Sequence, residues 1–102
     1  MSDIKDLQKK AMEINRRYAE QSKKKGEDPW TVQQLAQGYS GDIQELIELL
    51  EGKGAPENKL SHELGDCLWS VLVIAYKLGI DVEQAFWRTM AELDERFEKE
   101  RP

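Results

Sequence analysis

The sequence has few of the residues that build disulfides, thiolate metal sites or membrane spans. Cys67 is its only cysteine, so one chain forms no internal disulfide and no cysteine metal cluster. Leu64 and Leu68 lie close to it in the sequence, which predicts that Cys67 is a small buried side chain. No apolar run approaches the roughly 20 residues that span a bilayer. The start of the chain lacks the basic segment and apolar core of a signal peptide.

Basic residues are also fewer than acidic residues. The chain has 15 Lys and Arg against 20 Asp and Glu, which gives a net charge of −5, and the short basic run at 23–25 lies between Glu20 and Glu27. We therefore expect a cytoplasmic protein with neither nucleic acid nor a membrane as its partner. An anionic small molecule is still compatible with this charge, because bound divalent metals reverse the field of carboxylates.

Proline occurs three times in 102 residues, and the charged fraction of 34% accompanies a hydrophobic fraction of 39%. This balance, together with apolar residues at steps of three and four, predicts amphipathic helices rather than strands. Four helices are expected over roughly 3–24, 31–51, 56–78 and 81–98. Their starts are marked by Ser2 or Asp3, by Thr31-x-x-Gln34, by Pro56, and by Asp81-x-x-Gln84.

We expect an all-α protein whose protomer resembles a four-helix bundle and whose residues 1–102 form a single domain. A domain of this size buries only about two-thirds of its unfolded surface, so we also expect a homodimer or homotetramer. The third helix is apolar nearly all round, which predicts that it is central or contacts another subunit. We predict that its Trp69 and Tyr76 lie at the subunit interface.

Two acidic pairs at helical spacing are the strongest functional signal, Asp42-x-x-Glu45 and Glu63-x-x-Asp66. Residues three apart on a helix project from nearly the same face. Each pair lies on the same flank of its helix's apolar stripe, so two helices packed through these stripes would line one groove with four acids. With 20 acidic residues, such pairs also arise by chance on solvated surfaces. The second pair, however, leads directly into the apolar run CLWSVLVIAY, which favours a site.

Four carboxylates in one groove repel one another unless protons or cations neutralise them. Mg²⁺ and Mn²⁺ take hard oxygen ligands in octahedral geometry and complete their shells with water and substrate phosphates. The predicted cofactor is therefore Mg²⁺, with Mn²⁺ as an alternative. The predicted ligands are Asp42, Glu45, Glu63 and Asp66.

At these residues the sequence resembles the MazG-type nucleoside triphosphate pyrophosphohydrolases, part of an all-α superfamily that includes dimeric dUTPases. The mark of that family is E-x-x-E followed, after a spacer, by E-x-x-D. GDIQELIELLEG at 41–52 is similar to the first half and HELGDCLWSVLVIAYKLGIDVEQAF at 62–86 to the second. The resemblance covers roughly residues 31–97.

The resemblance implies an enzyme whose metals hold a nucleoside triphosphate and activate a water, giving a nucleoside monophosphate and pyrophosphate. It matches Glu45, Glu63 and Asp66 to metal-binding carboxylates. Asp42 takes the place of the family's first glutamate and is one methylene shorter. By position, Glu45 would orient or deprotonate the water, and the candidate catalytic residues are Glu45 and Glu63.

The last helix departs from the family pattern. Many members have a Lys-Phe-x-x-Arg stretch there, preceded by an asparagine, which helps contact phosphates. Here Glu92 stands at the lysine and Met90 at the asparagine, and only Arg96 is retained. Arg96 is the predicted phosphate contact, and Lys59, Arg88 or a lysine of the first helix could substitute for the missing cation.

Two further residues near the acidic pairs have alternative interpretations. Trp30 lies in a turn before the second helix, where family members place substrate-contacting aromatics, and it either stacks on the nucleobase or closes a small core. His62 precedes the second pair, and we expect it to point elsewhere on the helix as an exposed cap or turn residue.

These features favour a Mg²⁺-dependent hydrolase of nucleoside triphosphates, with noncanonical or deoxy forms as candidate substrates. The departures in the last helix motivate an alternative, a helical nucleotide-binding or oligomerisation module with weak or no catalysis. A third alternative is a structural bundle without ligands. Nucleotide and metal binding, with and without turnover, would distinguish these three functions.

Overall fold

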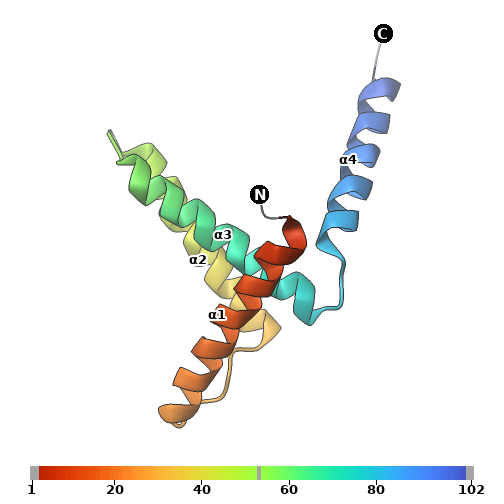
Figure 1. Ribbon diagram of the computed structural model, residues 1–102. Coiled ribbons are helices and arrows are strands. Elements are labelled where there is room, and N and C mark those ends of the chain that lie inside the picture. Colours follow the sequence, from red (N-terminus) through yellow and green to blue (C-terminus); the bar gives the residue numbers. More distant parts are fainter. Residues whose placement is uncertain (1–2, 53, 101–102) are drawn as a thin grey trace.

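The computed structural model describes residues 3–52 and 54–100, which form helices joined by short loops and contain no strand. The helices are α1 (Ile4–Lys24), α2 (Val32–Glu51), α3 (Glu57–Lys77) and α4 (Val82–Lys99) (Figure 1). The predicted all-α class and the four predicted helices are confirmed. None of these helices is long and apolar enough to cross a membrane.

Side chains cap three of the helices at their first turns. Asp3 and Asp81 each accept a hydrogen bond from the backbone N–H three residues later, at 2.9 and 3.0 Å. Thr31 and Gln34 form a complete capping box, with hydrogen bonds of 3.2 and 2.8 Å. Each cap satisfies a backbone donor that the helix itself leaves unpaired. These three predicted caps are therefore confirmed, with Asp3 as the cap of α1.

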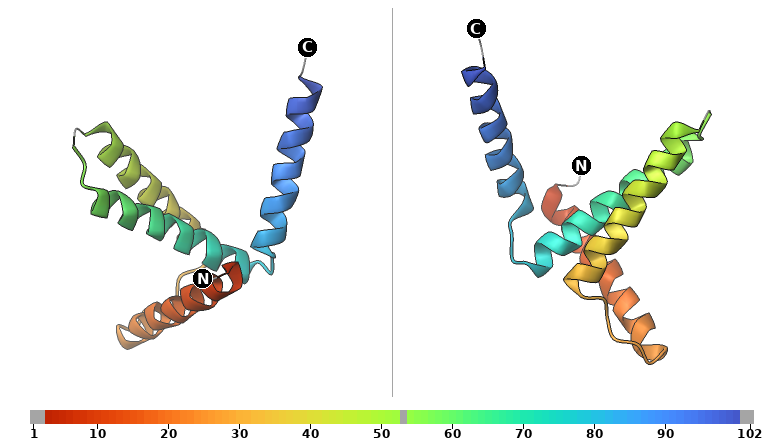
Figure 2. Two further views of the ribbon diagram at one scale, coloured as in Figure 1. Left: turned by 45° about the horizontal axis from the view of Figure 1, so that its top comes forward. Right: turned by 180° about the vertical axis from the view of Figure 1, so that it is seen from behind.

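The centre of the molecule is α3, the helix that contacts all three others. α2 lies alongside it as the other arm of an antiparallel hairpin, and α1 crosses the pair (Figures 1 and 2). The buried core joins Ala11 of α1, Leu35 of α2, and Leu72 and Val73 of α3. Because α3 offers apolar residues on several sides, it packs against different helices at once, and its predicted central position is confirmed.

Trp69, predicted at a subunit interface, packs against α1 within one chain, and its interface role stays a prediction. Its indole Nε1 donates a hydrogen bond to the backbone oxygen of Ala11 at 3.1 Å, and its ring meets the edge of the Tyr18 ring at a centroid distance of 5.7 Å. α1 therefore covers Trp69 within one chain. The spacing of apolar residues along α3 shows that several faces are apolar, but it does not say which helix covers each face. Tyr76 is 59% exposed, and its interface role stays a prediction.

α4 stands away from the other helices. The chain turns at Gly79, whose φ of 70° lies in the left-handed region that glycine adopts without strain, and α4 then leaves the α2–α3 hairpin as the second arm of a V (Figures 1 and 2). Within the described chain, α4 has no buried residue. The radius of gyration is 16.8 Å, against about 13 Å for a compact domain of 100 residues. The protomer therefore has the helices of a bundle without closing into one.

Candidate functional site

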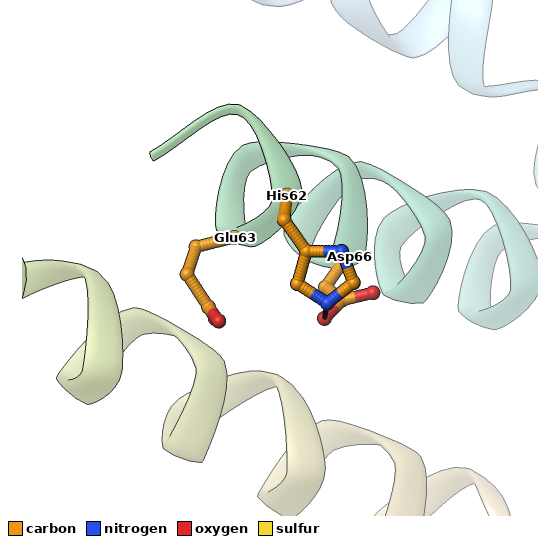
Figure 3. Close-up of side chains that lie close together, drawn as sticks. All are labelled: His62, Glu63 and Asp66. Atoms are coloured by element: carbon orange, nitrogen blue, oxygen red, sulfur yellow. Dashed lines mark ion pairs between the residues drawn. The ribbon is translucent and has the colours of Figure 1, made fainter. Parts of the chain in front are cut away.

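The four predicted carboxylates come together where α2 and α3 lie side by side. Asp42, Glu45 and Glu63 each offer an oxygen atom, and these three atoms lie within 4.8 Å of one another. Glu63 and Asp66 form a second such group with a ring nitrogen of His62 (Figure 3). Glu63 belongs to both groups, so its side chain is the centre of the cluster.

The antiparallel hairpin explains this arrangement. Asp42 and Glu45 are separated by less than one turn of α2, and Glu63 and Asp66 by less than one turn of α3, so each pair shares a face. The faces border the packed interface between the two helices, because Asp42, Glu63 and Asp66 are partly buried while Glu45 is exposed. The cluster is therefore held by two regular helices rather than by loops.

Crowding and partial burial raise the pKa of two of these carboxyls. For Asp42, the largest cause of the raised pKa is desolvation, followed by repulsion from Asp66 and Glu45, while His62 acts in the opposite direction. For Glu63, desolvation again comes first, followed by repulsion from and hydrogen bonding with Glu45. Both shifts mean that the charged forms lack compensating positive charge. A cation placed in the cluster would supply it.

Glu63 also has an atom without a partner. Its Oε2 is buried and makes no hydrogen bond to any described residue. A buried carboxylate oxygen without a partner is costly, and native structures usually satisfy such atoms with a protein group, a water or an ion. This unpartnered oxygen, within reach of two other carboxylates, fits the donor set of a hard divalent cation.

Two cavities border the cluster, and each pair of acids contributes one residue to each cavity. The first, which we call the Trp30 groove, has a volume of about 620 Å³ and includes Asp42 and Asp66 in its lining. The second, which we call the Lys59 cavity, has a volume of about 700 Å³ and includes Glu45 and Glu63. The carboxylates therefore form the boundary between the two spaces.

The Trp30 groove is the aromatic side of the site. Trp30, Tyr18 and Trp69 contribute rings to its lining, together with Leu35. The ring of Trp30 lies against α2 where Gly38 has no side chain, since a Cβ atom at Gly38 would meet Trp30 Cζ3 at 3.0 Å. The indole is 55% exposed, so one part of it contacts α2 while another is open to the groove.

Comparison with known proteins agrees with this geometry. A family model described as the MazG nucleotide pyrophosphohydrolase domain matches residues 30–100, which includes Trp30, all four carboxylates and α4. The chain belongs to the MazG nucleotide pyrophosphohydrolase family. A comparison with curated proteins gave no match, and neither did one with solved structures.

His62 of this MazG domain lies at the carboxylates, contrary to the expectation that it points elsewhere. Its Nε2 atom is 3.1 Å from Oδ2 of Asp66, although the imidazole side chain is 71% exposed (Figure 3). The sequence contains the signal for this contact, because positions 62 and 66 are four apart and share a helix face. The expected exposure is confirmed, and the expected direction is wrong.

Cys67 lies buried beside the MazG carboxylates, as its apolar neighbours predict. Desolvation raises its pKa, and the charges of Asp42, Glu63 and Asp66 raise it further. The side chain is therefore a thiol at neutral pH rather than a thiolate. This leaves the carboxylate oxygens as the charged ligand atoms of the cluster.

The predicted phosphate contact Arg96 is not brought to the cluster within one chain. It lies in the last turn of α4, the arm that leads away from the hairpin (Figure 1). Arg96 lines neither the Trp30 groove nor the Lys59 cavity.

Proposed function

We propose that this chain hydrolyses nucleoside triphosphates to a nucleoside monophosphate and pyrophosphate, using Mg²⁺ or, as an alternative, Mn²⁺. Noncanonical and deoxy nucleotides are the candidate substrates. Membership of the MazG family supports a nucleotide pyrophosphohydrolase, which is a hydrolase of acid anhydrides. The observation that carries the finer proposal is the convergence of four carboxylates around the unpartnered Oε2 of Glu63.

The proposed metal ligands are Asp42, Glu45, Glu63 and Asp66. Their oxygen donors match the preference of Mg²⁺ and Mn²⁺ rather than that of softer metals. A bound divalent ion would neutralise phosphate charge and polarise the phosphorus that is attacked. In its absence the cluster keeps excess negative charge, as the raised pKa values of Asp42 and Glu63 indicate.

Glu45 is the proposed acceptor of the proton from the attacking water. It is the exposed member of its carboxylate group, so water reaches it directly. The water oxygen forms a bond to the α-phosphorus while the bond from that phosphorus to the bridging oxygen breaks. The electron pair of the broken bond leaves with pyrophosphate, and the water proton passes to Glu45. Glu63 completes the catalytic pair by holding negative charge at the centre of the cluster.

Trp30 is the proposed stacking partner of the nucleobase. Its exposed ring opens into the groove that Asp42 and Asp66 also line, so a base stacked there would be close to the carboxylates. An indole stacks on the π-face of any base, whichever base it is. The Trp30 groove therefore suits nucleosides as a class.

Trp30→Ala is expected to raise the KM for a nucleoside triphosphate by roughly 5- to 150-fold, since stacking contributes about 1–3 kcal/mol per base. Steady-state rates of pyrophosphate release measure this change. Trp30→Phe, which keeps an aromatic ring, is the matched control and should recover part of the affinity. A lower urea midpoint with an unchanged KM would mean that Trp30 only closes a small core.

We propose that the chain assembles as a homodimer or homotetramer. α3 carries a row of exposed apolar side chains, and α4 carries large ones that nothing in the described chain covers. The exposed residues include Leu64, Leu68 and Val71 on α3, Leu78 directly after it, and Phe86, Trp87 and Phe97 on α4. A second copy packed against these rows would bury them, and it offers the route by which Arg96 reaches a phosphate.

A panel of canonical, noncanonical and deoxynucleoside triphosphates, assayed for pyrophosphate release with Mg²⁺ and with Mn²⁺, tests the function. We expect metal-dependent release of equal amounts of monophosphate and pyrophosphate from at least one member of the panel. Calorimetry on the same samples tests the alternative function, a nucleotide-binding module without catalysis. Binding of nucleotide and Mg²⁺ without any product would identify a nucleotide-binding module instead.

A further inference from the structure

The Lys59 cavity has a chemical character that differs from that of the Trp30 groove. Asn58, Lys59 and His62 of α3 line it opposite Glu45 and Glu48 of α2. The lining of this cavity contains no Trp, Tyr or Phe, and its one aromatic ring is the imidazole of His62, which is paired with Asp66, whereas Trp30, Tyr18 and Trp69 line the Trp30 groove. Of the two cavities, therefore, only the Trp30 groove offers a nucleobase a Trp or Tyr ring to stack on.

This difference between the two cavities predicts the orientation of the substrate in the site. If the base occupies the Trp30 groove, the triphosphate must run from Asp42 and Asp66 towards Glu45 and Glu63, because these carboxylates form the boundary between the two spaces. The bond that breaks then lies over the cluster. The far end of the triphosphate, which becomes pyrophosphate, extends into the Lys59 cavity.

Lys59 is the residue of this cavity that is suited to an anion. Its side chain is exposed in the first turn of α3, and its ammonium group forms no ion pair within 4.0 Å with any described residue. His62 is already paired with Asp66. An unpaired ammonium can move towards phosphate oxygens without breaking an existing contact, and charge-assisted hydrogen bonds to phosphate are among the strong ones.

We propose that the Lys59 cavity is the pyrophosphate subsite, in which Lys59 binds the terminal phosphates of the substrate and then the released product. This proposal rests on the proposed function and adds to it the orientation of the triphosphate in the site. Glu45, Glu48 and Glu63 make the lining negative overall, so pyrophosphate binds here as its complex with a divalent cation. Lys59 thereby supplies, from the start of α3, positive charge that α4 does not bring to the site within one chain.

The test measures inorganic pyrophosphate as a ligand and as a product inhibitor of the full chain in the presence of Mg²⁺. Lys59→Gln should weaken pyrophosphate binding by calorimetry about tenfold, the effect of losing one charge-assisted contact. It should also raise the inhibition constant of pyrophosphate and the KM of the triphosphate. Binding of the nucleoside monophosphate should not change. Lys59→Arg should restore pyrophosphate binding.

Two further variants complete the design. Arg17→Gln removes an exposed charge of α1 that lines neither the Lys59 cavity nor the Trp30 groove, and it should leave every constant as in the wild type. Lys77→Gln removes a cation of the Trp30 groove. If the triphosphate runs in the opposite direction, pyrophosphate affinity will fall in Lys77→Gln rather than in Lys59→Gln, and the proposal is then wrong.

The remaining outcomes separate this proposal from the proposed function. Turnover with unchanged pyrophosphate affinity in Lys59→Gln would overturn the subsite while keeping the hydrolase. A wild-type chain that neither releases nor binds pyrophosphate with Mg²⁺ would overturn the hydrolase itself. Glutamine, lysine and arginine have similar helix propensities, so the variants should keep the wild-type urea midpoint, which confirms that they fold.

Discussion

Replacing Glu63 with glutamine is expected to lower kcat by a factor on the order of 10²–10³, the usual cost of removing one group that stabilises charge in a transition state. The side chain belongs to both three-residue groups of the cluster, and its Oε2 has no other described partner. Glutamine keeps the size of the side chain but removes the negative charge that a divalent cation requires. Pyrophosphate release at saturating nucleotide and Mg²⁺ measures the effect.

The same substitution should make the metal-free protein more stable. Repulsion from Glu45, Asp66 and Asp42 helps to raise the pKa of Glu63, and a neutral amide relieves that repulsion. The urea midpoint measured without divalent metal should therefore be higher than that of the wild type. Adding Mg²⁺ should raise the midpoint of the variant by less than it raises that of the wild type. Loss of activity combined with a gain in metal-free stability distinguishes a functional carboxylate from a structural one.

Glu57→Gln is the matched control for this prediction. Glu57 begins the same helix, is exposed, and belongs to neither carboxylate group. Its variant should keep the wild-type kcat and respond to Mg²⁺ as the wild type does. Glu45→Gln, in contrast, should lose activity by orders of magnitude, because the proposed acceptor of the water proton is removed. Full activity in both Glu45→Gln and Glu63→Gln would exclude the proposed site.

Without divalent metal, raising the pH is expected to remove stability through Asp42 and Glu63. In the unfolded chain these carboxyls titrate near 3.8 and 4.5, and folding raises both pKa values. Between the unfolded and the folded pKa, the folded state binds more protons than the unfolded state, so the free energy of unfolding falls as pH rises. The stabilising contribution is complete below the unfolded values and is lost above the folded ones.

Saturating Mg²⁺ should reverse this loss at neutral pH, because the cation replaces the protons. At 100 times its dissociation constant, a ligand that binds only the folded state adds about 2.7 kcal/mol to the free energy of unfolding. Urea titrations between pH 4 and pH 8, with EDTA and with Mg²⁺, measure both effects. The control is the double variant Asp42→Asn, Glu63→Gln, which lacks both carboxyls and keeps every other group of the chain. Identical pH profiles for the wild type and the double variant would contradict the prediction.

The helices were predictable because their signals are local. Thr31 with Gln34 and Asp81 with Gln84 are three residues apart, and a cap of this kind depends only on a side chain and a backbone group within the same turn. The proximity of Asp42 to Glu45 and of Glu63 to Asp66 follows from helical spacing alone. That the two pairs meet one another required only that α2 and α3 pack through their apolar stripes as an antiparallel hairpin.

Contacts between distant parts of the chain could not be predicted from local patterns, whereas the one wrong expectation, the direction of His62, conflicts with ordinary helical spacing. Trp69 is covered by α1, through a hydrogen bond to a backbone atom 58 positions earlier, and no local pattern indicates that contact. His62 meets Asp66 through ordinary helical spacing, so the sequence contained this signal. The turn at Gly79 directs α4, with Arg96, away from the hairpin within one chain, and the phosphate contact of Arg96 stays a prediction.

The sequence by itself determined the helical class, the helix boundaries and the pairing of acids within each helix, because these depend on interactions over three or four residues. Only the tertiary structure decided that Glu63 is shared by two carboxylate groups, that the acids separate an aromatic groove from the Lys59 cavity, and that α4 stands apart. These features depend on how whole helices are placed in space. Placement results from packing between residues far apart in the chain, which a periodic pattern does not specify.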